Sequence, residues 1–210
     1  MGNYATEQEE FWAGEFGNQY VDRNNDDKLK AGALSFFSKV IASTRAVSSV
    51  MEFGANIGIN MMALKQLLPG VDLSAIEINS VAVNELKKIE DLKVYHQSIL
   101  EFSPEYTRDL VFTRGVLIHI NPDSLPQVYE ALYKTSKKYI LIAEYYNPRP
   151  AELKYREHSG KLFKRDFAGE MLDKYKDLRL IDYGFIYHRD INFPQDDINW
   201  FLLEKSTCEK

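Results

Sequence analysis

The stretch that decides the fold is Val50-Met51-Glu52-Phe53-Gly54-Ala55-Asn56-Ile57-Gly58-Ile59-Asn60, an apolar run followed by a glycine turn and a helical pattern. Such a turn after a strand lets the backbone approach a ligand at the carboxyl edge of a sheet. A dinucleotide fingerprint starting at Gly54 requires glycine at positions 54, 56 and 59, and only the first is glycine here. The turn therefore predicts a ligand site of another kind.

Strand and helix patterns alternate along the rest of the chain. Strands are expected over Ala46–Phe53, Val71–Ile78, Leu92–His96, Leu110–Thr113 and Tyr139–Glu144. Helices are expected over 27–42, between Gly58 and Pro69, over 80–89, from Asn121 onward and near 165–175. Two final extended runs, Arg179–Tyr187 and Ile198–Lys205, have no helical pattern between them and predict an antiparallel pair.

Near-continuous apolar strands separated by amphipathic helices are typical of a parallel sheet covered on both faces. The expected fold class is therefore α/β, with a doubly wound, Rossmann-like, mostly parallel seven-stranded sheet, an antiparallel C-terminal strand pair and helices on both faces. With 210 residues, we expect one compact domain. Within it, residues 1–45 would form an N-terminal helical lid and a first covering helix, and residues 46–210 the core.

Composition limits the partners and the compartment. A formal net charge of −5 lacks the basic footprint that binding to a phosphate backbone requires, so no nucleic-acid partner is expected. No apolar run approaches the roughly 18 residues of a membrane span, so no membrane partner is expected either. Cys208 is the single cysteine, which excludes an intrachain disulfide and fits a reducing cytoplasm. No feature of the sequence sets the oligomeric state.

An acid precedes the glycine turn. Glu52 stands two residues before Gly54, and glycine recurs at Gly58. The pattern resembles the first motif of class I S-adenosylmethionine-dependent methyltransferases, Glu-x-Gly-x-Gly-x-Gly, from which only Asn56 departs. Asparagine tolerates left-handed backbone angles, so we expect the turn to persist. The resemblance implies that this loop holds the methionine end of the cofactor, S-adenosyl-L-methionine.

A second acid extends the resemblance. Glu77 follows Glu52 by 25 positions and ends the next predicted strand. The family places there the carboxylate that binds both ribose hydroxyls, a task suited to a group that accepts two hydrogen bonds at once. Ser98 and Ile99 match the positions that line the adenine. The cofactor-binding residues implied in this way are Trp12, Glu52, Gly54, Asn56, Gly58, Glu77, Ile78, Ser98, Ile99 and Thr113.

The segment after the fourth strand favours a small-molecule acceptor. A methyltransferase of nucleic-acid amino groups would show an Asn/Asp-Pro-Pro-aromatic tetrad there, whereas Asn121-Pro122-Asp123-Ser124 lies too late and has one proline. Several segments together resemble a narrower group, the methylases associated with pseudaminic acid biosynthesis; they are 8–12, 115–122, 143–148, 160–167 and 193–197. That resemblance implies a small, anionic sugar-type acceptor, such as a nonulosonic acid or a nucleotide sugar.

Candidate catalytic residues follow the fourth and fifth strands, because ligands of open α/β sheets bind at the carboxyl ends of strands. His119, with an ordinary pKa near 6.5, could accept a proton from a hydroxyl acceptor or could be a structural partner. Glu144 could be catalytic or could cap the next loop. Amine and carboxylate acceptors would need no base.

Further side chains could contact the acceptor. Tyr145, Tyr146, His158, Lys164, Arg165 and His188 are the candidates. The basic members would bind a carboxylate or phosphate, unless they form a solvated charged face. Trp12, Phe16 and Tyr20 could form a lid or belong to the core, and no cluster has the spacing of metal ligands. Two alternatives stay open: a methyltransferase of another small amine or carboxylate metabolite, and a non-catalytic cofactor-binding sensor or subunit.

Overall fold

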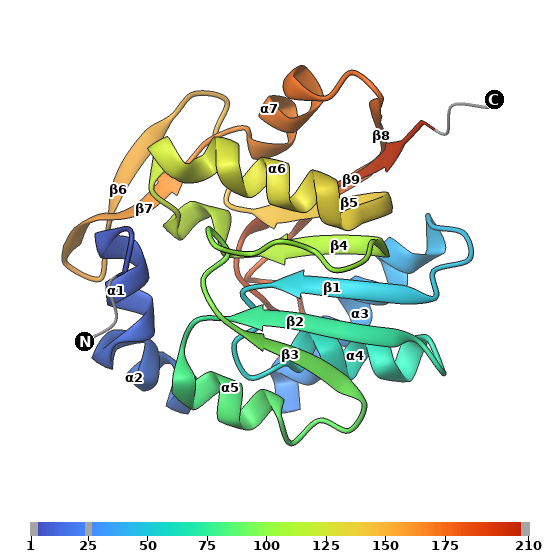
Figure 1. Ribbon diagram of the computed structural model, residues 1–210, viewed down its shortest axis with the longest axis horizontal. Helices are drawn as coiled ribbons and strands as arrows, with labels where there is room; N and C mark the ends of the chain where they lie inside the picture. The colour runs from blue at the N-terminus through green and yellow to red at the C-terminus, as the bar shows by residue number, and fades with distance from the viewer. Residues whose placement is uncertain (1–3, 24–26, 207–210) are drawn as a thin grey trace.

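In the computed structural model, seven strands of the described residues form a central sheet in the order β3-β2-β1-β4-β5-β9-β8 (Figure 1). The structure describes residues 4–23 and 27–206, so Cys208 lies outside the described residues. The parallel strands are β1 (Ser49–Phe53), β2 (Asp72–Glu77), β3 (Leu92–His96), β4 (Arg108–Arg114) and β5 (Ser136–Glu144). β9 (Ile198–Lys205) runs antiparallel to both β5 and β8 (Leu178–Ile186). The expected sheet is confirmed.

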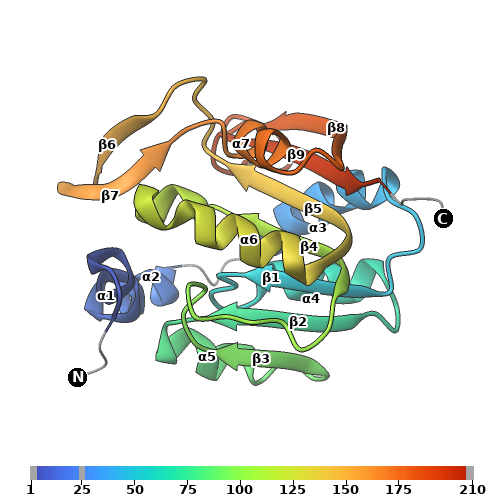
Figure 2. The ribbon, with the colours of Figure 1, turned by 45° about the horizontal axis from the view of Figure 1, so that its top comes forward.

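Helices cover both faces of the sheet, as expected (Figure 2). One apolar core lies between the sheet and α3 (Asp27–Ala42), α4 (Ile59–Leu67) and α5 (Ser80–Leu86). A second lies under α6 (Leu125–Thr135) and α7 (Phe167–Lys174). Successive strand side chains point to opposite faces, so Val50 joins the first core and Met51 the second.

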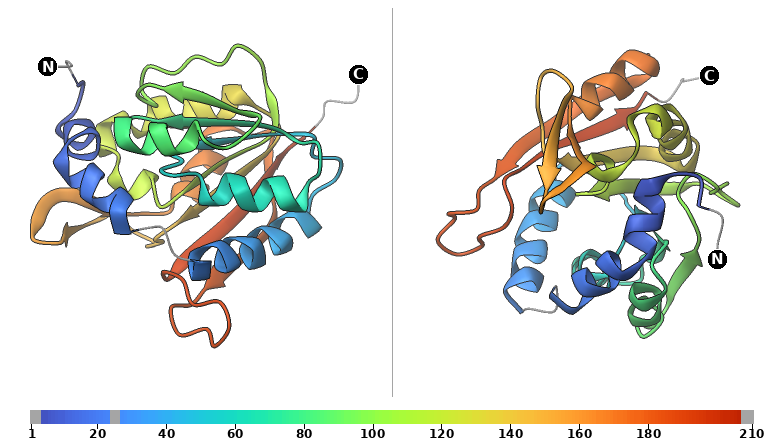
Figure 3. Two further views of the ribbon diagram at one scale, coloured as in Figure 1. Left: turned by 90° about the horizontal axis from the view of Figure 1, so that it is seen from below. Right: turned by 90° about the vertical axis from the view of Figure 1, so that its left-hand side faces the viewer.

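Two N-terminal helices lie across the carboxyl ends of the parallel strands (Figure 3, right). They are α1 (Glu7–Ala13) and α2 (Glu15–Arg23), separated at Gly14. α1 begins with a capping box, in which Thr6 and Glu9 each accept a hydrogen bond from the other's backbone N–H. The pair therefore occupies the place where a doubly wound sheet binds its ligands.

A separate hairpin was not expected from the sequence. β6 (Ala151–Tyr155) and β7 (His158–Lys164) form a two-stranded antiparallel sheet beside α1 (Figures 1 and 2). Its two-residue turn is Arg156-Glu157, with φ of 44° and 69°. Such turns normally carry asparagine or glycine, so the usual signal is missing. β7 contacts η1 (Leu117–His119), a short 3-10 helix that follows β4.

Several element boundaries differ from expectation by a few residues, and at two of them the backbone shows why. Ala46 has a φ of 52°, so the chain turns there and β1 begins at Ser49 rather than at Ala46. The helix expected from Asn121 begins as a 3-10 turn, η2 (Pro122–Ser124), and continues as α6. Among the described residues, none of the helices is long and apolar enough to cross a bilayer.

Candidate functional site

A cavity of about 700 Å³ lies at the carboxyl ends of the parallel strands, between the N-terminal helices and the loop before β9. This is the edge at which open α/β sheets bind ligands. Residues from the sequence prediction that line it are Trp12, Glu52, Gly54, Asn56, Glu77, Ile78, Ser98, Ile99, His119, Tyr145 and His188. Predicted residues that do not line it are Gly58, Thr113, Glu144, Tyr146, His158, Lys164 and Arg165.

The glycine turn has the left-handed backbone that the sequence predicts. Gly54 has a φ of 77° and Asn56 a φ of 49°, so asparagine does replace glycine in the turn. A Cβ at position 54 would lie 2.7 Å from Cγ2 of Val116, so the backbone at this point leaves no room for a side chain. Gly58 lies behind the loop, where a Cβ would meet Ile89, and its role is close packing. The loop thus presents bare backbone to the cavity.

Glu77 is held by backbone amides at the end of β2. Its Oε2 accepts from the N–H of Asn56 at 2.7 Å, and its Oε1 accepts from Ile78 at 2.9 Å and Asn79 at 2.8 Å. Burial raises the pKa of this carboxyl, although the three amides act in the opposite direction. A carboxylate offers about four lone-pair positions, so acceptor capacity is left on Oε2 toward the cavity.

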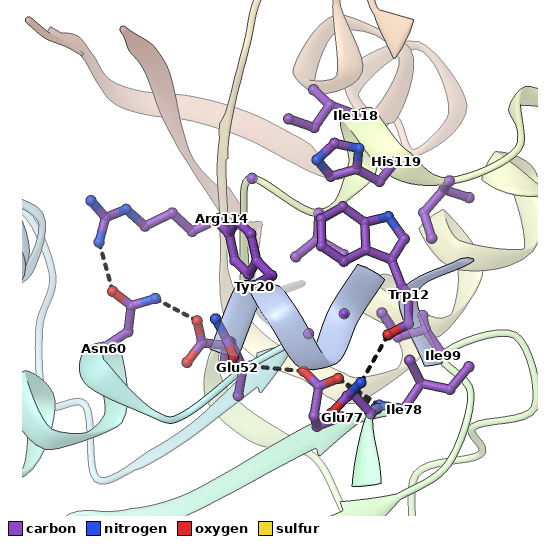
Figure 4. Close-up of a pocket in the computed structure, with 18 of the residues that line it drawn as sticks. Trp12, Tyr20, Glu52, Asn60, Glu77, Ile78, Ile99, Arg114, Ile118 and His119 are labelled. Carbon is purple, nitrogen blue, oxygen red and sulfur yellow. Dashed lines mark hydrogen bonds between the residues drawn. The ribbon is translucent and has the colours of Figure 1, made fainter. Parts of the chain in front are cut away.

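Glu52 is the penultimate residue of β1 and is 1% exposed. Its Oε1 accepts from Nδ2 of Asn60 at 2.5 Å, while Oε2 is buried without a hydrogen-bond partner (Figure 4). Burial raises the pKa of this carboxyl to about 8, against the opposing effects of Asn60 and the nearby Arg114 charge. An orphaned buried oxygen beside a bare backbone turn fits a ligand that brings a hydrogen-bond donor or a cation.

The N-terminal helices are joined to the cavity wall by polar contacts. The Ser98 hydroxyl donates to Glu9 of α1 and accepts from the N–H of Leu100 at 2.9 Å. The Asn79 side chain donates to the carbonyl of Trp12 at 3.1 Å and to Oδ1 of Asn18 at 2.8 Å. These contacts place apolar Ile78 and Ile99 in a wall closed by α1 (Figure 4).

His119 lies against the rings of Trp12 and Tyr155, with ring centroids 4.6 and 4.8 Å from its own. Figure 4 shows His119 beside Trp12. Its Nδ1 donates to the carbonyl of Lys161 in β7 at 2.6 Å, which leaves Nε2 as the acceptor. Burial lowers the pKa of the imidazole to about 4. The pKa therefore lies below the ordinary value near 6.5, because the ring is desolvated by the side chains around it.

Glu144 braces a loop rather than facing the cavity. Its carboxylate accepts from the backbone N–H of Val116 at 3.1 Å, Leu117 at 3.1 Å and Ile118 at 3.4 Å. The side chain is 2% exposed, and burial raises its pKa to about 7. Of the two possibilities left by the sequence, the geometry matches the loop cap, and the catalytic role stays a prediction.

The candidate acceptor residues divide into two sets. Tyr145, Lys164 and His188 line a second cavity of about 380 Å³, together with Asp196 and Asp197. His188 is oriented by Asp197, whose carboxylate oxygens both lie 2.9 Å from Nδ1.

The other candidates reach neither cavity. Tyr146 packs beside Phe201, and His158 packs on Phe11 with ring centroids 5.0 Å apart. Arg165 pairs with Glu170 at 2.6 Å. Each of these side chains has a partner within the chain, and their contact with an acceptor stays a prediction.

Some cavity residues were missed from the sequence. Arg114 donates to Oδ1 of Asn60 at 2.7 Å and to Oε1 of Gln195, joining β4 to the loop before β9. Gln195 belongs to a segment that the family resemblance included, and Arg114 directly precedes another, yet no local pattern brings the two residues together. Within residues 4–23 and 27–206, no group of His, Cys, Asp and Glu side chains is placed to hold a metal ion.

Comparisons with known proteins concern the fold. No protein-family model matches the sequence, and no curated protein matches it. Among solved structures, the Burkholderia thailandensis 1,6-didemethyltoxoflavin-N1-methyltransferase, with its substrate and S-adenosylhomocysteine bound, aligns with a TM-score of 0.69 and 14% identity. That alignment covers 98% of this chain and 93% of the other.

Two further solved structures also align with this chain along nearly its whole length. The plantazolicin methyltransferase BpumL in complex with S-adenosylhomocysteine has a TM-score of 0.66 at 13% identity, covering 94% of this chain and 93% of that one. Magnesium protoporphyrin IX methyltransferase from Synechocystis PCC 6803, with S-adenosylmethionine bound, has a TM-score of 0.64 at 13% identity, covering 98% and 100%. Over nearly its whole length, the chain therefore has the fold of these small-molecule methyltransferases.

Proposed function

We propose that this protein is an S-adenosylmethionine-dependent methyltransferase of a small molecule. The observation that carries the proposal is the Glu77 carboxylate, fixed by three backbone amides in the wall of a ligand-sized cavity at the carboxyl end of β2. Neighbours of the same fold bind S-adenosylmethionine or S-adenosylhomocysteine. The glycine turn and Glu52 at the end of the adjacent strand support the same assignment.

Different residues of the cavity wall would bind the ribose, the methionine end and the adenine of the cofactor. Glu77 would accept hydrogen bonds from the ribose hydroxyls with the lone pairs that its backbone donors leave unused. The turn at Gly54 and Asn56, with Glu52 behind it, would receive the methionine end. Ile78, Ser98 and Ile99 would enclose the adenine, and Trp12 would close the cavity from above. Gly58 and Thr113 would act indirectly, by packing beneath the loop and within β4.

When bound, the cofactor supplies a methyl group on an electrophilic sulfonium. The chain's task is then to position the acceptor and to exclude water, which α1, α2 and the β6–β7 hairpin would do. For a hydroxyl acceptor we assign the proton-accepting role to Nε2 of His119, which stays neutral and is aimed by the carbonyl of Lys161. An amine or carboxylate acceptor would need only the positioning.

The acceptor we propose is small and anionic, of the nonulosonic acid or nucleotide-sugar type. Basic side chains in the cavity walls support this choice: Arg156 and His188 line the main cavity, and Lys164 lines the adjoining one. A second candidate, an amine acceptor, is favoured by the rings of Trp12, Tyr145 and Tyr155 in the same wall, because aromatic faces attract cations.

Binding and turnover test the proposal separately. By titration calorimetry, S-adenosylhomocysteine should bind the wild type, and Glu77→Ala should weaken binding at least about tenfold through the lost charge-assisted hydrogen bonds. Unchanged affinity in a folded Glu77→Ala variant would remove the ribose from this site. Product mass spectrometry over a panel of anionic sugars and amines would then identify the acceptor. Release of S-adenosylhomocysteine with any of them separates an enzyme from a cofactor-binding sensor.

A further inference from the structure

Arg114 brings a partly buried positive charge to the cavity wall without a matching carboxylate. Nη1 donates to Asn60 at 2.7 Å, Nη2 donates to Gln195, and the ring of Phe36 lies 5.1 Å below the guanidinium carbon. Both hydrogen-bond partners are neutral amides. Among the described residues, Arg114 forms no ion pair, although Glu52 and Asp196 are near enough to act on it.

A guanidinium has five N–H donors, and these two contacts use two of them. Burial lowers the pKa of Arg114 because a charge removed from water without a partner is unfavourable. A planar fork with free donors is suited to a carboxylate, which it binds through two parallel hydrogen bonds. The wall at Arg114 therefore has the chemistry of a carboxylate site.

The complementary half of the site is Glu52. Asn60 touches both residues, donating to Glu52 through Nδ2 and accepting from Arg114 through Oδ1 (Figure 4). The free Oε2 of Glu52 therefore lies one amide side chain away from the guanidinium. An α-amino acid carries an ammonium and a carboxylate on one carbon, so it could pair with both groups at once.

We propose that Arg114, positioned by Asn60 and Gln195, binds the carboxylate of the cofactor's methionine moiety, while Glu52 binds its ammonium. This inference rests on the proposed function and assigns a site to Arg114, which has no place in the glycine-loop motif. The carboxylate could instead belong to the acceptor. The shared contact with Asn60, which follows the glycine turn in the chain, favours the cofactor.

The test uses three ligands that differ at the amino-acid end: S-adenosylhomocysteine, its decarboxylated analogue, which keeps the amine, and methylthioadenosine, which lacks both groups. Calorimetric affinities are measured for the wild type, Arg114→Met and Glu52→Gln. Arg114→Met should weaken S-adenosylhomocysteine about 10- to 100-fold and leave the decarboxylated analogue within about threefold. Glu52→Gln should weaken both amine-bearing ligands and spare methylthioadenosine.

Controls separate this inference from folding and from the proposed function. Arg179→Met makes the same chemical change on β8, where Arg179 pairs with Glu204 outside both cavities, and should leave all three affinities unchanged. Arg114→Lys should recover part of the loss, since it restores charge without the fork. If Arg114→Met weakens all three ligands equally, or none, the inference is wrong and the carboxylate belongs elsewhere. If the wild type binds neither S-adenosylhomocysteine nor methylthioadenosine, the proposed function itself fails, and the inference with it.

Discussion

Glu52 and Glu77 lie near the ends of neighbouring strands, yet their carboxylates are held in different ways. Glu77 accepts three backbone N–H groups, whereas Glu52 receives one side-chain donor and keeps a buried oxygen without a partner. Fixed amides stabilise a carboxylate in place before a ligand arrives. An oxygen without a partner, in contrast, gains most when a ligand supplies one. The first acid is therefore preorganised, and the second responds to binding.

This difference predicts a pH dependence of stability without ligand. The pKa of Glu52 is about 8 in the folded protein and near 4.5 in the unfolded chain, so the folded state holds the proton more tightly. The contribution of Glu52 is full below about pH 4.5 and is lost as pH rises toward about 8, an effect on the order of a few kcal/mol. Denaturant unfolding of the wild type and Glu52→Gln across this range measures it.

Comparing the wild type with Glu52→Gln separates the contribution of Glu52 to stability from that of other carboxyls. Burial also raises the pKa values of Glu77 and Glu144, but both carboxyls are present in either protein. As pH rises toward about 8, the stability of the wild type relative to Glu52→Gln should therefore fall. Above about pH 8 the difference between the two proteins should stay constant. A difference that does not vary with pH would mean that Glu52 has the same pKa in the folded protein as in the unfolded chain.

A second prediction concerns His119. With a pKa of about 4, its imidazole is neutral from pH 5 upward, so the rate profile should show no step near pH 6.5 from this residue. With a hydroxyl acceptor, His119→Ala should lower turnover about 10²-fold, the low end of the usual range because the base is weak. S-adenosylhomocysteine affinity should be nearly unchanged. A fall of less than about tenfold at saturating acceptor would leave positioning as the whole mechanism.

Part of this cavity could be predicted from the sequence. Glu52, Gly54, Asn56 and Glu77 were predicted from their resemblance to a known motif, and all four line the cavity. Arg114 was missed because its meaning depends on Asn60 and Gln195, which three separate elements bring together. For the same reason the low pKa of His119 could not be foreseen, since Trp12 of α1 and Tyr155 of β6 supply the rings around it.

Asn79 connects elements on two sides of the cavity. Its Oδ1 accepts from the N–H groups of Val81 and Ala82 and caps α5, while its Nδ2 donates to Trp12 in α1 and Asn18 in α2. Asn79→Ala should lose both functions, and Asn79→Asp should keep the cap but lose the donor. Loss of the cap typically costs about 1 kcal/mol.

Hydrogen exchange can tell these functions apart. Amides of α1 and α2 should exchange faster in both variants, while amides in the first turn of α5 should exchange faster only in Asn79→Ala. If α1 and α2 keep wild-type protection in Asn79→Asp, the contacts between Glu9 and Ser98 suffice to hold the helices, and Asn79 is only a cap.

The β6–β7 hairpin shows where element prediction stopped. The parallel strands were predictable because apolar runs buried on both faces leave a strong pattern. Most of β6 is exposed, β7 buries only Lys161 and Leu162, and the turn at Arg156-Glu157 lacks the usual residues. Their place in the fold depends on distant contacts, such as the carbonyl of Gly160 with Gln8 and that of Lys161 with His119.

For the molecule as a whole, these contacts join the N-terminal helices, the hairpin and the sheet around one cavity. The sequence indicated residues 1–45 and 46–210 as parts of a single domain, which predicts one cooperative unfolding transition. A ligand that binds only the folded state then stabilises every part together. At roughly 100 times its Kd this amounts to about 2.7 kcal/mol, or a Tm increase of about 5–10 °C for a chain of this size.

Calorimetric melting with S-adenosylhomocysteine tests both expectations in one experiment. The single transition should move upward as a unit, and the wild type should gain more than Glu77→Ala at the same ligand concentration, because the variant lacks the ribose carboxylate. NAD is the matched control ligand, since it carries adenosine but requires a glycine loop that this chain lacks at positions 56 and 59. Two separate transitions would contradict the single domain. An equal Tm increase with NAD would mean that the cavity recognises adenosine alone, and would remove the methionine end from the specificity of the site.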